Sequence, residues 1–310
     1  MREPVAETED WLLRYGVILG KRYTEKQKKK FLRSASKEFQ SMGYNVAVTR
    51  SEVSVLKTEK KSFYNLYAGD LKKADVVFAT YYDTPVKSFN LYRQVAFQNH
   101  VPRMAATVHL FVLVALIVLA GALFYYGLLP GIYNKGLLSL PTVGTIALAL
   151  LFFYLIMHFR SGIPNRVNMT RNTSSLLALL QTANELSKKQ QKRVAFALID
   201  GGTTTDYGSR MLKDALGSSR APIVFLDSVG NTGPFQWFTS KKMTLPAEDQ
   251  QHPLSDDQKE LGDILLTAGT YADGQVVIEQ ANSSKDKQLD EQKVASAAKR
   301  LKHIAAQLIH

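Results

Sequence analysis

The residue types best suited to metal or acid–base chemistry are scattered along this sequence. Its six histidines are His100, His109, His158, His252, His303 and His310. A zinc site usually draws three or four imidazole, carboxylate or thiolate ligands from short, characteristic spacings, and no histidine here is paired at such a spacing. The chain has no cysteine, which excludes a thiolate metal site, a cysteine nucleophile and disulfides.

Nucleophilic and phosphate-binding motifs are equally weak. Ser174 and Ser209 lack a nearby histidine or aspartate motif that would activate a hydroxyl. The glycine-rich run GGTTTDYGS, which starts at Gly201, lacks the lysine and the spacing of a phosphate-binding P-loop. We interpret this run as a turn between a strand and a helix.

Two long apolar runs dominate the middle of the chain, at Met104–Tyr126 and Leu137–His158. A helix needs about 20 apolar residues to cross the hydrocarbon core of a bilayer, and each run is long enough. The segment between them, Gly127–Gly136, contains a proline and three glycines and is typical of a turn. We predict a transmembrane hairpin at 104–158, with helices 104–126 and 137–158; a pair of buried core helices is the alternative.

The charges that flank the two runs predict the topology. Lys87, Arg93 and Arg103 precede the first run, and Arg160, Arg166 and Arg171 follow the second, whereas the turn carries only Lys135. Basic residues concentrate on the cytoplasmic side of membrane proteins. We therefore expect a cell-membrane protein with two spans and both termini in the cytoplasm. We interpret His109 and His158 as anchors of the cytoplasmic ends of the helices, with a functional intramembrane histidine as the alternative.

The net charge of +12 favours contact with an anionic surface. Nucleic acid and the anionic lipids of the cytoplasmic leaflet both fit this charge, but no nucleic-acid-binding motif is present. With a hairpin in the chain, we expect the partner to be an anionic lipid surface and not nucleic acid.

The remaining sequence alternates short apolar runs with amphipathic segments. Strands are predicted at 44–50, 51–58, 62–69, 75–82, 193–200, 221–230 and 275–281, and helices at 8–20, 24–44, 172–187, up to Leu216, 254–270 and 289–309. Residues 84–103 fit an interfacial helix or a connector equally well, and 245–253 read as a loop. This alternation predicts an α/β fold: a three-layer domain with a central mixed β-sheet flanked by helices. Its first part is 1–103 and its second part 159–310, with the hairpin 104–158 inserted between them.

The segment from Thr24 to Tyr44 has all the signals of an amphipathic helix. Thr24 can cap its start, an apolar face contains Phe31 and Phe39, and Gly43 ends it. The run Lys28–Lys30 is interpreted as the solvated face of this helix, with contact to anionic lipid as the alternative.

Five segments, taken in order, resemble a known family. They are YNLYAGDLKKADVVFATYYDTP, MTRNTSSLLALLQTANEL, VAFALIDGGTTTDYGSR, IVFLDSVG and NSSKDKQLDEQKV. Their order and spacing resemble the di-zinc aminopeptidases of metallopeptidase family twenty-eight, which includes glutamate carboxypeptidase and the transferrin receptor. The resemblance extends from about Asn65 to the C-terminus and implies a zinc-peptidase-like fold.

The resemblance places the family's first two motifs on either side of the hairpin. The first zinc-binding histidine falls on Tyr81, and the aspartate that supports it is present as Asp83. The aspartate that bridges the two zinc ions falls on Arg171, which precedes Asn172. In the family these positions meet in one cleft, joined by a short loop. The resemblance therefore implies that the hairpin replaces that loop and holds the cleft close to the cytoplasmic surface of the bilayer.

The later motifs are also altered. The general-base glutamate falls on Gly202 and the metal-binding glutamate beside it on Thr203. The aspartate ligand of the next strand is present as Asp227, while the last histidine ligand falls on Asn282, before a retained Asp286. One of five metal ligands therefore remains, and the general base does not.

The replacements predict a chain without bound zinc. Tyrosine, arginine, threonine and asparagine cannot supply a catalytic zinc site, and the Arg171 guanidinium would place a cation where a carboxylate held two metal ions. We expect Arg171 to form an ion pair with Asp227 or Asp83 instead. No cofactor is expected, and no group that could activate a water remains.

Three functions follow. The first is a membrane-anchored, inactive aminopeptidase-like domain that binds a peptide or protein at the cytoplasmic membrane face, where Arg171 could receive a carboxylate. The second is an active or divergent membrane-bound zinc aminopeptidase, and the third is an accessory role in transport centred on the hairpin. The vestigial cleft of the first function would consist of Tyr81, Asp83, Arg171, Asn172, Gly202, Thr203, Asp227 and Asn282. The sequence does not fix the oligomeric state.

Overall fold

The structure, a computed structural model, describes residues 4–56, 59–86, 94–98, 103–136, 138–159, 165–166, 168–279, 281 and 286–309. The chain divides into two compact units. Unit 1 comprises Met1–Pro85, Arg93–His100 and Pro164–His310, and unit 2 comprises Val86–Tyr92 and Val101–Ile163. The predicted hairpin lies in unit 2, and each unit is described by itself below.

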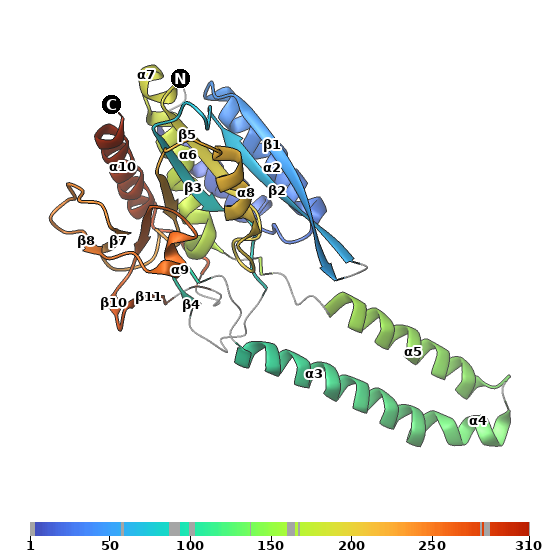
Figure 1. The fold of residues 1–310 in the computed structure, drawn as a ribbon. Coiled ribbons are helices and arrows are strands. Elements are labelled where there is room, and N and C mark those ends of the chain that lie inside the picture. Colours follow the sequence, from blue (N-terminus) through green and yellow to red (C-terminus); the bar gives the residue numbers. More distant parts are fainter. Residues whose placement is uncertain are drawn as a thin grey trace. The chain divides into compact units, whose positions relative to one another are not determined.

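Unit 1 is built on a mixed eight-stranded sheet in the order β1-β2-β5-β3-β6-β9-β7-β8 (Figure 1). The strands are β1 (Val46–Leu56), β2 (Glu59–Ala68), β3 (Val76–Tyr81), β5 (Val194–Ile199), β6 (Ile223–Leu226), β7 (Phe235–Thr239), β8 (Gln250–His252) and β9 (Ile264–Ala268). The central strands β5, β3, β6 and β9 are parallel. β2 is antiparallel to β5, and β7 is antiparallel to β9. The predicted mixed sheet is therefore confirmed.

Helices cover both faces of this sheet, as the three-layer prediction requires. One face packs against α1 (Pro4–Trp11), α2 (Glu25–Ser41), α6 (Ser174–Glu185) and α10 (Glu291–Leu308). The other face packs against α8 (Tyr207–Leu216) and a small sheet of β10 (Tyr271–Ala272), β11 (Gln275–Ile278) and β4 (Gln94–Val95). Unit 1 also contains the short helices α7 (Lys188–Gln191) and α9 (Asp256–Lys259) and the π-helix η3 (Met169–Thr173).

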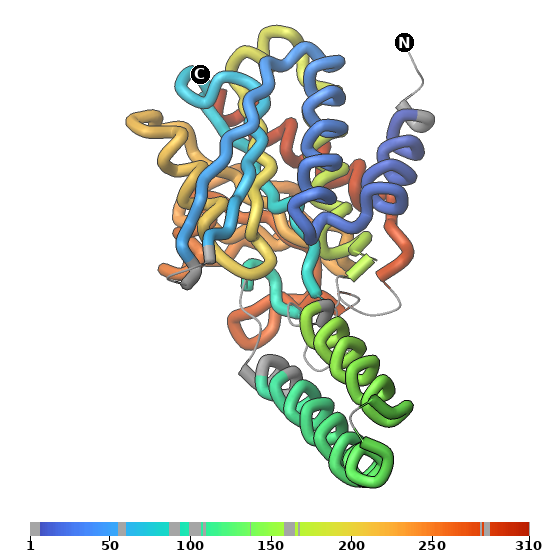
Figure 2. The backbone as a smooth tube through the Cα atoms, turned by 90° about the vertical axis from the view of Figure 1, so that its right-hand side faces the viewer, coloured from blue at the N-terminus to red at the C-terminus, as the bar shows by residue number. Residues whose placement is uncertain are grey.

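The N-terminal helices follow their sequence signals closely. Thr24 caps α2 in a capping box with Gln27, Phe31 and Phe39 are buried, and Gly43 follows the helix with a φ of 97°. α1 continues directly into the π-helix η1 (Leu12–Ile18), so the helix predicted at 8–20 is present. This continuous helix runs beside α2 (Figure 2), where Arg14 forms an ion pair with Glu38.

Three predicted elements differ from the structure. The helix predicted at 254–270 is wrong, because only α9 is helical there and Ile264–Ala268 form β9, a strand buried along its whole length. Gly262 and Gly269 bound this run, and Gly269 has a φ of 146°, which stops a helix. The loop predicted at 245–253 contains the edge strand β8. The two strands predicted at 44–58 are one long strand, β1.

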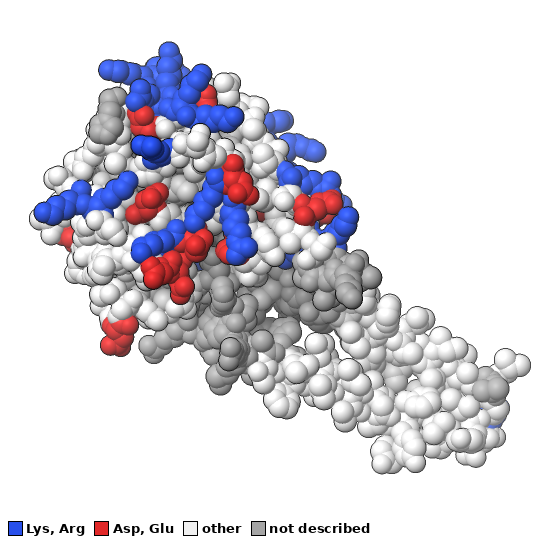
Figure 3. Space-filling view, in the orientation of Figure 1, with Lys and Arg blue, Asp and Glu red and all other residues white. Residues whose placement is uncertain are grey.

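Unit 2 contains two long apolar helical segments. The first consists of α3 (Arg103–Ala122), the π-helix η2 (Leu123–Leu128) and α4 (Leu129–Lys135), and the second is α5 (Leu140–Phe159). Leu110–Lys135 and Leu140–Met157 are long and apolar enough to cross a membrane. Between Met104 and Phe159 the only charged residue is Lys135, so the surface of these helices is almost entirely uncharged (Figure 3).

The turn predicted at 127–136 is shorter than expected, because helix continues to Lys135 before Gly136 breaks it. Pro130 lies in the first turn of α4, directly after the π-helical turn η2, and irregular helical turns of this kind often accompany a proline. The connector predicted at 84–103 lies mostly outside the described residues; within it the structure shows β4.

Candidate functional site

The predicted site lies at the carboxyl ends of three neighbouring parallel strands. Tyr81 is the last residue of β3, Gly202 lies just beyond β5, and Asp227 follows β6. In α/β sheets this edge is the usual place for ligands. Seven of the eight predicted positions meet here and all seven are buried, namely Tyr81, Asp83, Arg171, Asn172, Gly202, Thr203 and Asp227. The eighth, Asn282, lies outside the described residues.

Asp227 is held entirely by protein donors. The Tyr81 hydroxyl donates to its Oδ1 at 2.7 Å, and the Ser228 hydroxyl donates to the same oxygen at 2.8 Å. Its Oδ2 accepts the backbone N–H of Phe97 at 2.7 Å. Phe97 and Ser228 both have positive φ, 64° and 54°, a conformation that costs energy in a residue with a side chain. The backbone thus adopts a costly conformation at both Phe97 and Ser228, the two residues whose groups bind this carboxylate together with Tyr81.

Tyr81 fills the space in front of Gly202. A Cβ added to Gly202 would lie 2.2 Å from the Tyr81 Cβ and 2.6 Å from its Cγ, so no larger residue fits there. Burial raises the pKa of the Tyr81 hydroxyl well above its ordinary value, and the Asp227 charge raises it further. The phenol therefore stays protonated and acts as a donor. Positions 81 and 202 are sterically coupled: the closest contact is to the Tyr81 Cβ, so with this backbone any residue that carries a Cβ at 81 requires a glycine at 202.

Asp83 has a different set of partners. Its Oδ2 accepts the Thr203 hydroxyl at 2.5 Å and the Thr203 N–H at 3.3 Å. The ion pair expected from Arg171 to Asp83 or Asp227 is not among the ion pairs of the described residues. Arg171 instead contributes its backbone carbonyl, which accepts the Tyr81 hydroxyl at 3.1 Å and the Ser228 hydroxyl at 3.3 Å.

A buried arginine that no sequence prediction included, Arg22, binds this cluster through Asn172. Arg22 is completely buried, and its guanidinium donates to the carbonyls of Tyr82 and Tyr15, each at 2.6 Å, and to the Asn172 side-chain oxygen. Asn172 in turn donates to the Tyr81 carbonyl at 2.7 Å. Burial lowers the pKa of Arg22 to about 10, while the charge of Asp83 opposes that change, so Arg22 remains a cation at neutral pH.

A second missed cation is Lys28. Its ammonium forms a buried ion pair with Asp200, the residue after β5, and Asp200 also accepts the backbone N–H of Tyr64 at 3.1 Å. Burial raises the pKa of Asp200, and the nearby Lys28 charge opposes the rise. The prediction that Lys28–Lys30 form a solvated face is thus wrong for Lys28. The signal was present, because Lys28 precedes Phe31, Leu32 and Ala35 by three, four and seven residues, which places it on the apolar face of α2.

Asp286, which the resemblance matches to the last motif, caps the π-helix η3. Its Oδ1 accepts the Thr170 N–H at 2.5 Å, while its Oδ2 has no hydrogen-bond partner among the described residues. Burial raises the pKa of this carboxyl to about 7, although the bonds from Thr170 and the Arg171 charge oppose the rise. The carboxyl therefore titrates near neutral pH.

This titration predicts a measurable pH dependence of stability. The folded state holds the Asp286 proton more tightly than the unfolded chain, whose pKa is about 3.9, so this residue's contribution to stability falls as pH rises from about 4 to about 7. Asp286→Asn keeps the acceptor and removes the charge. We expect the variant to be about 1 to 4 kcal/mol more stable than the wild type near pH 8, with little difference near pH 4. Urea denaturation at both pH values measures this, and a variant that is less stable near pH 8 contradicts it.

The residues of this edge do not fit a zinc ion. No group of three or more His, Asp or Glu side chains in the described part of the chain has metal-site geometry. Asp227 already accepts hydrogen bonds on both oxygens, and the other described side chains at the positions that the resemblance matches to metal ligands are a phenol, a guanidinium and a hydroxyl. These donors offer zinc neither the charge nor the number of ligands that it requires.

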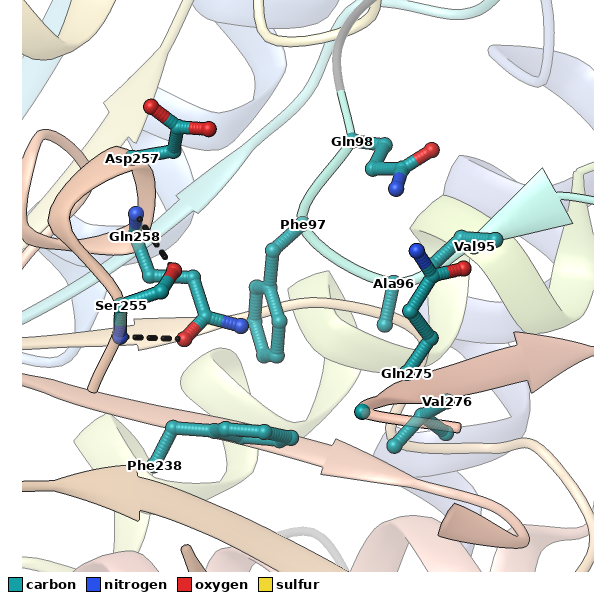
Figure 4. Close-up of a pocket in the computed structure, with 11 residues that line it drawn as sticks. Val95, Ala96, Phe97, Gln98, Phe238, Ser255, Asp257, Gln258, Gln275 and Val276 are labelled. Atoms are coloured by element: carbon teal, nitrogen blue, oxygen red, sulfur yellow. Dashed lines mark hydrogen bonds between the residues drawn. The ribbon is translucent and has the colours of Figure 1, made fainter. Parts of the chain in front are cut away.

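A cavity of about 200 Å³ lies next to this cluster (Figure 4). Phe97, whose backbone N–H binds Asp227, lines it with its ring, which packs edge-to-face on Phe238 at a centroid distance of 5.6 Å. The amide side chains of Gln98, Gln258 and Gln275 supply polar groups around the two rings. The cavity is thus linked to Asp227 through one residue. The sequence reading did not identify any of these positions.

Comparisons with known proteins bear on the fold. No protein-family model and no curated protein matches the sequence. The fold is similar to that of a Zn-dependent exopeptidase from Parabacteroides distasonis, with a TM-score of 0.54 and 11% identity over 97% of this chain and 96% of that chain.

Two proteins of Bacteroides thetaiotaomicron are similar in the same way. They are a glutaminyl cyclase bound to N-acetylhistamine (TM-score 0.56, 10% identity, 97% of this chain and 96% of that chain) and a leucine aminopeptidase precursor (TM-score 0.56, 9% identity, 97% and 95%). At such low identity the likeness concerns the fold alone. Unit 1 therefore has an α/β fold similar to that of the zinc exopeptidase, as the sequence resemblance implied, and the same fold occurs in the glutaminyl cyclase.

Proposed function

We propose that this chain is a non-catalytic, peptidase-like binding module that α3 and α5 tether to a membrane, with both termini in the cytoplasm. The observation that carries the proposal is the Tyr81 side chain, which packs on Gly202 and donates to Asp227. It occupies the place where the resemblance would put a metal ligand and the general base. The similar structures carry two different activities by name, so the fold by itself selects neither.

Most polar groups of this edge bind other protein groups, although the buried Oδ1 of Asp83 has no hydrogen-bond partner among the described residues. Asp227, Asn172 and Thr203 bind other protein groups, and all seven described residues are buried. Water activation needs a base that can reach a water molecule in an open site, and none of these groups meets that condition. This sheet edge therefore stabilises the fold of the module and does not catalyse a reaction.

The cavity beside Phe97 is the proposed binding site. Two aromatic rings and three amide side chains suit a peptide, because the rings accept an apolar side chain while the amides donate to and accept from a peptide backbone. Its volume of about 200 Å³ corresponds to one or two side chains and not to a long peptide. The partner we propose is thus a peptide segment or a protein that inserts one anchor residue.

One experiment separates this proposal from an active zinc aminopeptidase. The detergent-solubilised chain, purified in the presence of zinc, is analysed for metal and then incubated with a mixture of short peptides that is read by mass spectrometry. We expect much less than one zinc per chain, retention of a subset of peptides and no cleavage. Stoichiometric zinc with chelator-sensitive cleavage would overturn the non-catalytic assignment, and failure to retain any peptide would overturn the assignment of a peptide-binding cavity.

A further inference from the structure

Several large apolar side chains are exposed together at one place on unit 1. Among its described residues, those exposed are Leu13, Val17, Ile18 and Val48, and the first three belong to the π-helix η1. Their exposed fractions are 54%, 44% and 69%. Single exposed apolar residues are ordinary, but three on one short helix form an apolar patch, and such patches indicate contact with a membrane or another molecule.

The three side chains share one face of η1. Hydrogen bonds in a π-helix run from residue i to i+5, so residues four and five apart lie on the same side. The opposite side is packed into unit 1, where Tyr15 and Gly16 are buried. A Cβ on Gly16 would lie 2.8 Å from the Met169 side chain, which shows how closely η1 is seated on η3. The apolar face therefore points outward because the other face is fixed.

This patch adjoins the segment by which the chain re-enters unit 1. A Cβ on Gly20, just beyond η1, would lie 3.1 Å from the backbone oxygen of Arg166. Arg166 follows Phe159, the last residue of α5, by seven residues, a length that covers at most about 25 Å when fully extended. Lys21, three residues after Ile18, and Arg166, whose backbone lies next to Gly20, are both exposed, so two basic residues are close in the chain to the apolar face or its neighbour Gly20.

We propose that Leu13, Val17 and Ile18 insert into the boundary between lipid headgroups and acyl chains of the bilayer that α3 and α5 span, with Lys21 and Arg166 against anionic headgroups. This rests on the membrane tether of the proposed function. An apolar face with a basic edge is the composition of helices that lie in the membrane interface. A patch of three aliphatic side chains falls far short of the roughly 800 Å² per partner of a stable protein interface, which favours lipid over a second copy or another protein.

The absence of native cysteine makes the test direct, since each introduced cysteine is the only thiol in the chain. The full chain is reconstituted into vesicles of phosphatidylcholine and phosphatidylglycerol with a spin label at one of three positions. Val17→Cys reports on the patch, and Leu119→Cys in α3 reports on the tether. Ser218→Cys, exposed in the turn between α8 and β6, reports on a surface in water. Ile18→Cys repeats the patch measurement if Val17→Cys lowers the melting temperature.

The readout is collision of each label with oxygen, which concentrates in lipid, and with a water-soluble nickel chelate. We expect the label at Val17 to favour oxygen several-fold over the label at Ser218, at a depth of about 5 to 10 Å, and the label at Leu119 to lie deeper. A Val17 label as open to the chelate as Ser218, with Leu119 in lipid, overturns this inference and leaves the tether intact. A Leu119 label in water overturns the tether itself. A Val17 label shielded from both reagents identifies a protein as the occupant and also overturns the inference.

Discussion

Replacing Lys28 with methionine should lower the free energy of unfolding by about 3 to 5 kcal/mol. Methionine keeps the length of the side chain but leaves the completely buried Asp200 carboxylate without its cation, and a broken buried ion pair costs about this much. Urea denaturation of the detergent-solubilised chain measures the loss. The effect should be larger near pH 8 than near pH 5, because at low pH the uncompensated carboxyl takes up a proton and the penalty disappears.

Two companion variants show whether the buried charge is the cause. Lys29→Met, one residue along α2, removes an ammonium whose side chain is 54% exposed and pairs with Glu25, and it should cost less than about 1 kcal/mol. Lys28→Met combined with Asp200→Asn should recover part of the loss, since no ionised group then remains in the interior. Equal losses from Lys28→Met and Lys29→Met would show that the ion pair contributes no special stability.

Replacing Gly202 with alanine should cost about 3 kcal/mol, the upper end of the usual penalty for overpacking. The added methyl would lie 2.2 Å from the Tyr81 Cβ, an atom fixed by its backbone, so the strand ends must move apart. That movement would strain the bond from the Tyr81 hydroxyl to Asp227. Thermal and urea denaturation measure the effect.

Thr204→Ala is the matched control for this prediction. Thr204 lies two residues further along the same turn and is exposed, so its truncation should change stability by less than about 0.5 kcal/mol. If Gly202→Ala proved as mild as Thr204→Ala, Tyr81 would not fill the space in front of Gly202, and room for a larger side chain would remain at the position that the resemblance matches to the general base.

The layered architecture was predictable because it depends on local patterns. The capping box at Thr24 and the buried run Val194–Ile199 each follow from a few neighbouring residues. The prediction for β9 was wrong for two reasons. Ser255 is a typical helix start, and the segment Asp263–Thr270 follows it. The apolar run in this segment also lacks the alternation that would distinguish a strand from a helix, because a strand buried on both faces is apolar throughout. Its neighbours β6 and β7, which decide the matter, are distant in the sequence.

The site was predictable as a set of positions but not as a network of contacts. The order of motifs led to Tyr81, Asp83, Arg171 and Asp227, which meet at one sheet edge. The partners of these residues could not be read from the sequence. Phe97 reaches Asp227 with a backbone N–H, which any residue could supply. Arg22 reaches Asn172 from the N-terminal helices, and nothing in the local sequence distinguishes it from an exposed arginine.

The strand order of unit 1 also sets the sequence of events during synthesis. β3 pairs on one side with β5, where Val76 faces Val194, and on the other with β6, where Val77 faces Ile223. Both partners leave the ribosome only after α3 and α5 have been made. Under the proposed topology, the two apolar helices are therefore presented to the insertion machinery while β3 still has two open edges, and the N-terminal third of the chain must wait in an incomplete state. Insertion of the hairpin precedes completion of the sheet, so a failure of insertion would leave an unpaired central strand exposed to aggregation and to proteases.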